Sequence, residues 1–238
     1  MEGWVILKLA KVIAWMAGFL ILIRLMSYPI AQTFDSTEIL RLPLSDKVIV
    51  LDPGHGGADG GAVGAGEILE KDIALTVTQK LRDYLQQAGA EVYLTREADR
   101  DLANEETKTI SQRKVEDIKN RVTFMEEKDP DIFISIHLNS LPTPQWRGAQ
   151  TFYHPNQPES KVLAEAIQDQ IKSGLDNTDR EALAINTVYV LKHANRPAAL
   201  VEIGFLSNPD ERELLIQSPY QDRMAASIYF GILNYFSQ

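Results

Sequence analysis

The sequence predicts a single α/β domain with a mostly parallel, twisted sheet of about six strands and helices on both faces. From residue 47 to residue 238, short apolar runs that end in turn or polar residues alternate with longer segments of helical periodicity. Strands that alternate with helices favour parallel pairing, because the crossover helices cover both faces of the sheet. With 45% hydrophobic residues among 238, the chain can fill one sizeable core.

The first half of this domain is expected to contain strands at 47–52, 90–96 and 131–137, the first of them ending at a Pro-Gly turn. A helix is expected over 69–88, closed by a glycine. Its apolar face comprises Ile73, Val77, Leu81, Leu85 and Ala88. Another helix begins at Ser111, a candidate N-cap. Its apolar face comprises Val115, Ile118, Val122 and Met125.

The second half of the domain repeats the alternation. Strands are expected at 149–154, 188–193 and 198–205, with a helix over 159–174 and a last helix over 220–236. The inward residues of these helices are Val162, Ala166, Ile167 and Ile171 in the earlier one, and Ala225, Ile228, Ile232 and Phe236 in the last. No repeat or low-complexity tract interrupts the pattern, so we expect no second domain.

An apolar stretch precedes the domain. Residues 12–23 are an unbroken apolar run, with Lys8 and Lys11 before it and Arg24 after it. Such a run at the N-terminus is typical of a signal peptide or an uncleaved signal anchor, and the preceding lysines favour a C-terminal part outside the membrane. We therefore expect a signal segment over 1–27, a linker over 28–46, and an exported domain over 47–238 that stays at the membrane when the segment is not cleaved.

Charge and cysteine content exclude several classes of function. The formal net charge is −9, and no cluster of Lys and Arg with interleaved aromatic residues occurs. A nucleic-acid partner is therefore not expected. The sequence has no cysteine, which excludes disulfides, thiolate metal ligands and cysteine nucleophiles.

Polar residues lie where the expected strands and the first helix meet one edge of the sheet. In open α/β sheets, ligands bind beyond the carboxyl ends of the strands. His55 follows the first strand, and His137 ends the strand over 131–137. Glu70 lies at the start of the first helix. Glu202 lies inside an apolar strand, where an unpaired carboxylate is costly to bury, so a site or a salt bridge must account for it.

Position alone leaves alternatives open. His154 and His193 also end expected strands, and Glu67 is a second carboxylate close to the helix start. A glutamate near a helix start is commonly a residue that compensates the helix dipole. The glycines that follow His55 favour that histidine, because they let the backbone approach a ligand closely.

Two neutral imidazoles and one carboxylate form a catalytic zinc ligand set with a fourth position left for water. Zinc lowers the pKa of that water from ~15.7 to ~7. A second carboxylate that does not bind the metal can then act as general base and general acid. This division of labour needs two histidines and two glutamates, and the sequence offers them at suitable places.

The motifs around these residues resemble those of the zinc-dependent N-acetylmuramoyl-L-alanine amidases, in the same order and over nearly the whole domain. They are LDPGHGG (51–57), LEKDIALTV (69–77), ISIHLNS (134–140) and VEIGFLSNPDE (201–211). The resemblance implies that one Zn²⁺ is bound by His55, Glu70 and His137, and that Glu202 is the catalytic glutamate.

The same resemblance bears on the remaining candidates. It favours the carboxylate at the helix start over Glu67 and gives no role to His154 or His193. Arg121 and Asn139 also lie in contexts similar to the family, the first as a structural residue and the second as a residue that shapes the site. The implied reaction is hydrolysis of the amide between N-acetylmuramic acid and L-alanine, with peptidoglycan strands and their stem peptides as substrate.

Within that family, the chain is similar to germination-specific members from endospore formers. The shared features are a short N-terminal apolar segment, no wall-binding repeats and a charged insertion around 97–114. This implies action on spore cortex, at the outer face of the cytoplasmic membrane, in the cell wall or in the intermembrane space of the developing spore. A polysaccharide deacetylase would act afterwards to form muramic-δ-lactam.

Other readings of the same residues remain. One is an amidase of general cell-wall turnover, another is a non-catalytic wall-binding protein on the same fold, and a third is a zinc hydrolase for a different amide, such as a carboxypeptidase. The 97–114 insertion gates access, holds a partner or forms a solvated surface loop.

Overall fold

A computed structural model describes residues 2–26 and 42–238 of the chain, which belong to two units, Met1–Arg41 and Leu42–Gln238. The described part of the first unit is α1 (Glu2–Met26). Its segment Ile6–Met26 has a mean hydropathy of 2.1, has no buried residue, and is long and apolar enough to cross a membrane. A signal peptide and a membrane anchor both have this length and composition. Residues 27–41, most of the expected linker, lie outside the described residues.

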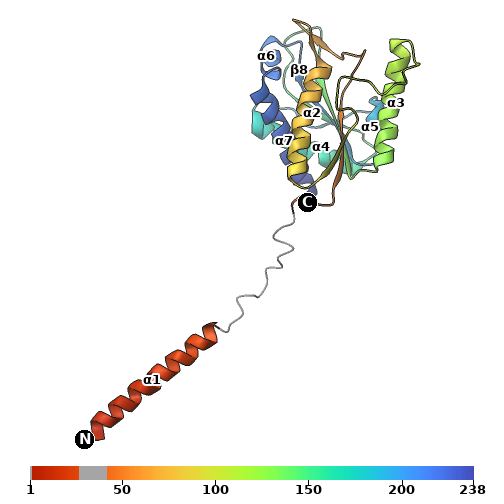
Figure 1. The fold of residues 1–238 in the computed structure, drawn as a ribbon. Helices are drawn as coiled ribbons and strands as arrows, with labels where there is room; N and C mark the ends of the chain where they lie inside the picture. Colours follow the sequence, from red (N-terminus) through yellow and green to blue (C-terminus); the bar gives the residue numbers. More distant parts are fainter. Residues whose placement is uncertain (1, 27–41) are drawn as a thin grey trace. The chain divides into compact units, whose positions relative to one another are not determined.

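The second unit contains a six-stranded sheet, a two-stranded hairpin and the helices that connect their strands (Figure 1). Its elements in chain order are β1 (Val48–Pro53), β2 (Val63–Gly64), β3 (Ile68–Leu69), α2 (Glu70–Gln87), β4 (Glu91–Leu94), α3 (Ile110–Lys128), β5 (Ile132–Asn139), β6 (Gln150–Tyr153), α4 (Pro158–Leu175), β7 (Leu183–Ala184), α5 (Tyr189–His193), β8 (Ala198–Phe205), α6 (Pro209–Leu215) and α7 (Ser218–Phe236).

The large sheet has the strand order β4-β1-β5-β8-β6-β7. Strands β4, β1, β5 and β8 are parallel to one another. β6 is antiparallel to β8, and β7 is parallel to β6. The prediction of a mostly parallel sheet is thus confirmed. The register pairs His137 of β5 with Glu202 of β8, so these two side chains lie next to each other on one face.

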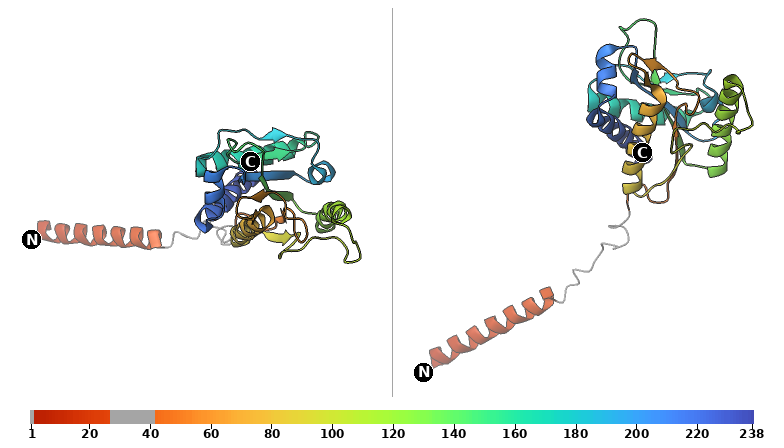
Figure 2. Two further views of the ribbon diagram at one scale, coloured as in Figure 1. Left: turned by 90° about the horizontal axis from the view of Figure 1, so that it is seen from above. Right: turned by 45° about the horizontal axis from the view of Figure 1, so that its top comes forward.

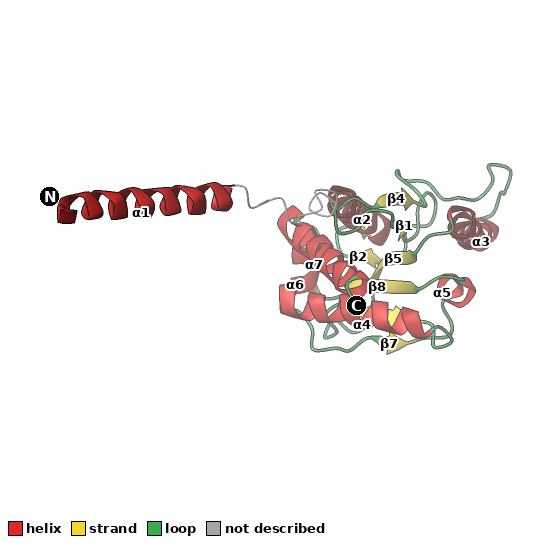
Figure 3. Ribbon diagram, turned by 90° about the horizontal axis from the view of Figure 1, so that it is seen from below, coloured by secondary structure: helices red, strands yellow, loops and turns green. Residues whose placement is uncertain are grey.

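Helices cover both faces of the sheet, as predicted. In Figure 3, α2, α4 and α7 lie on one side of the strands and α3 and α5 on the other. Figure 2 shows from two further directions that α3 stands apart from α2, α4 and α7. The larger hydrophobic cluster fills the side of α2, α4 and α7, and a smaller one fills the side of α3 and α5. These two clusters hold the strand ends in fixed positions.

The strand predicted over 188–193 is wrong: this segment forms the short helix α5. Both edges of β8 are already paired, with β5 and β6, so a strand that immediately precedes β8 has no place beside it. The helical turn instead buries Val190 and Leu191 in the smaller cluster. His193 therefore ends a helix and not a strand. The sixth strand of the sheet is β7, which lies a few residues earlier.

Some expected boundaries and faces also differ. The expected linker ends before residue 46, because Leu44 is fully buried and its N–H donates to the Ala88 carbonyl. The cap of α3 is Thr109 and not Ser111.

The predicted apolar faces of the helices differ in part. In α3, Val115 and Ile118 are exposed, and only the second half of its apolar stripe reaches the sheet. Val162 at the rim of α4 is also exposed, and Phe236 is half-buried, whereas the predicted face of α2 is buried throughout.

Candidate metal centre and active-site cleft

Three residues selected from the sequence converge at the carboxyl ends of the parallel strands. The candidate ligand atoms of His55, Glu70 and His137 all lie within 4.8 Å of one another. His137 Nδ1 is 2.9 Å from Glu70 Oε1, and His55 Nε2 is 3.2 Å from Glu70 Oε2. Ligands bound at 2.0–2.1 Å in a tetrahedral arrangement lie about 3.3 Å apart. The donor set and its spacing therefore fit a zinc-sized cation.

Two glycines allow the three ligands to approach one another. A Cβ atom on Gly54 would lie 2.4 Å from the His137 ring, and one on Gly61 would lie 2.5 Å from Glu70 Oε2. Gly61 also has a φ of 70°, a region that favours glycine. Any side chain at either position would displace a candidate ligand, so the geometry of the cluster requires glycine at both positions.

A neighbouring carboxylate orients the His55 ring. His55 Nδ1 is 2.9 Å from Asp59 Oδ2, and an ionised carboxylate only accepts, so Nδ1 carries the proton and Nε2 presents its lone pair to the cluster. Burial lowers the pKa of His55, but Glu70 and Asp59 outweigh it and raise that pKa above its usual value. Lys114 Nζ, 2.7 Å from Asp59 Oδ1, holds this carboxylate in turn.

Backbone amides fix the Glu70 carboxylate at the first residue of α2. Oε1 accepts the Leu138 N–H at 2.9 Å and Oε2 accepts the Ala62 N–H at 2.7 Å. Burial raises the pKa of Glu70, but His137 and His55 outweigh burial and lower it far below its usual value. The group is therefore ionised, which is the state that a metal ligand requires.

Glu202 stands beside the cluster without belonging to it. Its Oε2 is buried and has no hydrogen-bond partner among the described residues. Burial raises the pKa of Glu202 to about 7; Glu70 adds to this shift, while His137 and His55 oppose it. The carboxyl lines a cleft of about 400 Å³ whose other walls come from α3 and the segment 187–190. A buried carboxyl that titrates near neutral pH is suited to accept and return a proton.

A buried ion-pair network supports the turn that carries His55. The carboxylate of Asp52 is 2.5 Å from Arg121 Nη1, and Arg121 Nε is 2.9 Å from Asp117 Oδ2. Burial raises the pKa of Asp52, but Arg121 and the hydroxyls of Thr95 and Ser135 outweigh it and lower the pKa below its usual value. All three charged groups are nearly inaccessible to solvent.

Two buried arginines also hold the backbone on either side of the cluster. Arg121 Nη2 donates to the His55 carbonyl at 2.6 Å. Arg96 Nη2 donates to the carbonyls of Gly54 and Lys71, both at 2.8 Å. Because Gly54 precedes one candidate ligand and Lys71 follows another, Arg96 fixes the distance between their backbones. These contacts also hold His55 at a φ of 59°, which is unusual for a residue other than glycine.

We expect Arg121→Met to destabilise the folded domain by about 3–5 kcal/mol, because it leaves two buried carboxylates without their partner. Urea unfolding followed by circular dichroism measures the change. The matched control is Arg82→Met, which removes an exposed ion pair with Asp83 and is expected to cost at most about 1 kcal/mol. Equal effects of the two substitutions would show that the buried network adds nothing.

The beginning of the 97–114 insertion is hydrogen-bonded to the segments that carry the candidate metal centre. Asp99 accepts the Gly57 N–H at 2.8 Å and the Lys71 ammonium at 2.7 Å. Lys71 also donates to the Gly57 carbonyl at 2.8 Å. This closed set of hydrogen bonds joins the turn after His55 to the start of α2, so the first part of the insertion braces the site.

Asp99→Asn is expected to lower zinc affinity about 10-fold, at the low end of the range for groups that orient metal ligands. Competition with a chromogenic chelator measures the affinity. Asp83→Asn serves as control, since Asp83 is similarly exposed and also paired with a cation, but lies on the far part of α2. Unchanged zinc affinity in Asp99→Asn would exclude the bracing role.

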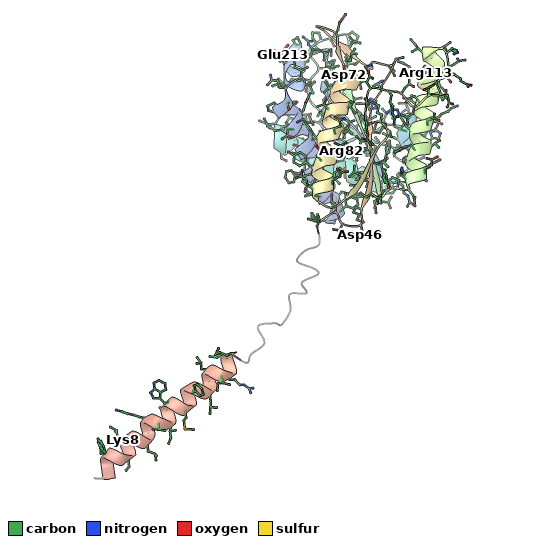
Figure 4. All side chains as sticks on the ribbon, viewed as in Figure 1. Lys8, Asp46, Asp72, Arg82, Arg113 and Glu213 are labelled. Atoms are coloured by element: carbon green, nitrogen blue, oxygen red, sulfur yellow. The ribbon has the colours of Figure 1, made fainter. Side chains whose placement is uncertain are left out.

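The remaining sequence candidates are not members of the cluster of ligand atoms. Glu67 is exposed at the tip of the β2–β3 hairpin, and His154 and His193 are outside the group of ligand atoms. Asn139 ends β5, where its carbonyl accepts the Leu206 N–H. In Figure 4, Asp72 in the first turn of α2 and Arg113 in the first turn of α3 lie at the same end of the domain, and Asp46 lies at the opposite end. The cluster lies at the end marked by Asp72 and Arg113.

Sequence reasoning missed the supporting residues Asp59, Arg96 and Asp99. Arg96 and Asp99 contact segments more than twenty residues away in the chain, so no local pattern reveals them. Asp59 had a weak local signal, since it lies four residues after His55 in the glycine-rich turn.

An α/β fold with a His–Glu–His cluster and an unpaired buried glutamate beside it defines a hydrolase with a candidate metal centre. Residues 49–234 match the N-acetylmuramoyl-L-alanine amidase family (Amidase_3), and the chain belongs to this family. This confirms the resemblance seen in the four sequence motifs.

Individual relatives are similar over most of the chain. A germination-specific N-acetylmuramoyl-L-alanine amidase from Bacillus subtilis is 48% identical over 97% of both chains. The CwlD amidase from Clostridioides difficile, solved in complex with the GerS lipoprotein, is 42% identical with a TM-score of 0.79, covering 81% of this chain and 99% of that one. The catalytic domain of CwlV from Paenibacillus polymyxa is 33% identical with a TM-score of 0.70, covering 80% and 98%.

Proposed function

We propose that the chain hydrolyses the amide bond between N-acetylmuramic acid and L-alanine in peptidoglycan, with one Zn²⁺ held by His55, Glu70 and His137. The observation that carries the proposal is the convergence of these ligand atoms within 4.8 Å, in a chain of the amidase family. A bound zinc ion supplies Lewis-acid chemistry, which polarises the scissile carbonyl and makes water more acidic.

Glu202 moves the protons in this proposal. It accepts a proton from the attacking water and later gives it to the amine of alanine as that amine leaves. Its buried carboxyl, with one oxygen unpartnered and a pKa of about 7, supports this role. The supporting contacts of Asp59 and Arg96 keep the ligand side chains in place while the substrate occupies the cleft.

We further propose that the enzyme is exported and acts on spore cortex, before a polysaccharide deacetylase that completes muramic-δ-lactam. The similarity to the germination-specific amidase of Bacillus subtilis, which is 48% identical over 97% of both chains, supports a role in germination. The apolar helix α1 supports export. In this placement the domain works at the outer face of the cytoplasmic membrane, in the cell wall or in the intermembrane space of the developing spore.

Digestion of purified peptidoglycan by the detergent-solubilised full chain tests the reaction. We expect peptides with a new N-terminal alanine, detected by mass spectrometry, when zinc is present, and none after chelation. A released C-terminal amino acid would instead indicate a carboxypeptidase. A zinc-loaded chain that releases no product from peptidoglycan of spore cortex or of vegetative wall would indicate a non-catalytic wall-binding protein.

The same assay with two substrates tests the biological role. Faster release from spore cortex than from vegetative wall supports cortex maturation. The reverse preference would favour an amidase of general cell-wall turnover.

A further inference from the structure

Two arginines lie near the active-site end of β8 without an ion-pair partner among the described residues. They are Arg147, in the loop before β6, and Arg180, in the loop after α4. The chain carries a formal net charge of −9, yet neither arginine has a carboxylate within ion-pair distance among the described residues, whereas Lys172, for example, pairs with Glu181. Cations without such a neighbour are available to an anionic ligand.

Aromatic contacts place the Arg180 guanidinium over the ends of two central strands. Its Cζ is 5.0 Å from the centroid of the Phe205 ring and 5.8 Å from that of Trp146. Phe205 is the last residue of β8 and is paired with Asn139, the last residue of β5. These are the strands that carry Glu202 and His137, so the guanidinium lies just beyond the active site.

A second, independent contact leads to the same position. Arg180 Nη1 donates to Gln150 Oε1 at 3.4 Å. Gln150 of β6 is paired with Glu202 in the antiparallel register, and residues that stand directly opposite each other project to the same face of a sheet. Arg180 therefore contacts a side chain that projects from the same face of the sheet as the proposed general base Glu202.

The nearby Glu211 does not neutralise these arginines at close range. Its carboxylate accepts the N–H groups of Phe205 at 2.8 Å and Gly148 at 2.9 Å. Burial raises the pKa of Glu211, and these amides, together with Arg147 and Arg180, only partly oppose the shift. Glu211 thus braces the strand end, and the guanidinium groups keep their capacity to bind a further carboxylate.

We propose that Arg180, flanked by Arg147 and the exposed Trp146, binds a carboxylate of the peptide part of the substrate. The inference rests on the proposed amidase function. The lactyl carboxyl of muramic acid is consumed in the scissile amide, and the N-acetylated sugars are neutral, so an anionic group close to the bond belongs to the peptide. A guanidinium matches a carboxylate with two parallel hydrogen bonds.

A matched pair of soluble substrates tests this assignment with the zinc-loaded full chain in detergent. One is an N-acetylmuramoyl-L-alanyl peptide with free carboxylates, and the other is the same peptide with carboxamides. The variants are Arg180→Gln, Arg180→Lys and the control Arg223→Gln. Arg223 is an exposed arginine of α7 that donates to a backbone carbonyl at 2.9 Å and makes no ion pair among the described residues. Turnover and equilibrium binding are both measured.

We expect wild type and Arg223→Gln to favour the carboxylate substrate by about 10- to 100-fold, mainly through KM and binding. Arg180→Gln is expected to abolish that preference while kcat for the carboxamide stays unchanged, and Arg180→Lys to keep part of it. An equal loss on both substrates, or an unchanged preference, would overturn the assignment. Wild-type cleavage of either substrate supports the proposed function whatever the variants show, and binding decides the assignment even without cleavage.

Discussion

Replacing Glu202 with glutamine is expected to lower turnover by about 10²- to 10⁴-fold, the usual contribution of a positioned general acid–base group. Glutamine keeps the size of the side chain but cannot take up a proton. Because Glu202 lies outside the cluster of ligand atoms, the variant should retain one zinc ion per chain. Release of alanine-ended peptides measures turnover, and elemental analysis measures the metal.

The pH profile gives an independent readout of the same residue. The base form is the ionised one, so activity should fall as the pH drops through the pKa of Glu202. That pKa is about 7 in the protein alone and decreases when positive charge occupies the neighbouring cluster. We therefore expect the acid limb below pH 7, and its absence from Glu202→Gln. The control Glu67→Gln, at the exposed hairpin tip, should match wild type; a fully active Glu202→Gln would refute the role.

Replacing His137 with alanine is expected to remove the metal itself. One nitrogen ligand is lost from a set of three, and the loss in affinity should exceed the ~10–100-fold that follows removal of a group that only orients a ligand. Chelator competition on purified protein measures the affinity. The apparent melting temperature should also stop responding to added zinc, because a ligand stabilises the folded state only by binding to it.

His193→Ala is the matched control for this experiment. His193 is a histidine at the end of a short helix, its Nδ1 lies 2.9 Å from the Tyr189 carbonyl, and it is outside the ligand cluster. It should bind zinc as tightly as wild type. Undiminished zinc in His137→Ala would remove this histidine from the ligand set and leave Glu70 and His55 as an incomplete site.

The sheet could be predicted where a strand is buried on both faces. Segments 132–139 and 198–205 are predominantly apolar runs, and such runs are typical of the central strands of a parallel sheet. Glu202 could be singled out because a carboxylate within such a run needs a site or a partner, and His137 because it stands at the end of its predicted strand.

The segment 188–193 could not be assigned from its own residues. Its β-branched and aromatic residues favour a strand, but the outcome depends on whether an edge of the sheet is free, which is a property of the whole fold.

The helix α6, in contrast, has a local sequence signal. Asn208 caps the helix by accepting the Glu211 N–H, Pro209 begins it, and Glu211 stands at the third helical position.

The bonds of Glu70 have a consequence for when the metal can be acquired. Its carboxylate accepts the N–H of Ala62, in the loop between β1 and β2, and the N–H of Leu138 in β5. Its partner His137 is 67 residues further along the chain. The three candidate ligands come together only when β1, α2 and β5 have assembled, so the complete set of ligands does not exist in an unfolded chain. Under the proposed export and zinc binding, loading follows folding, and the free zinc concentration outside the membrane adds to the stability of the folded enzyme.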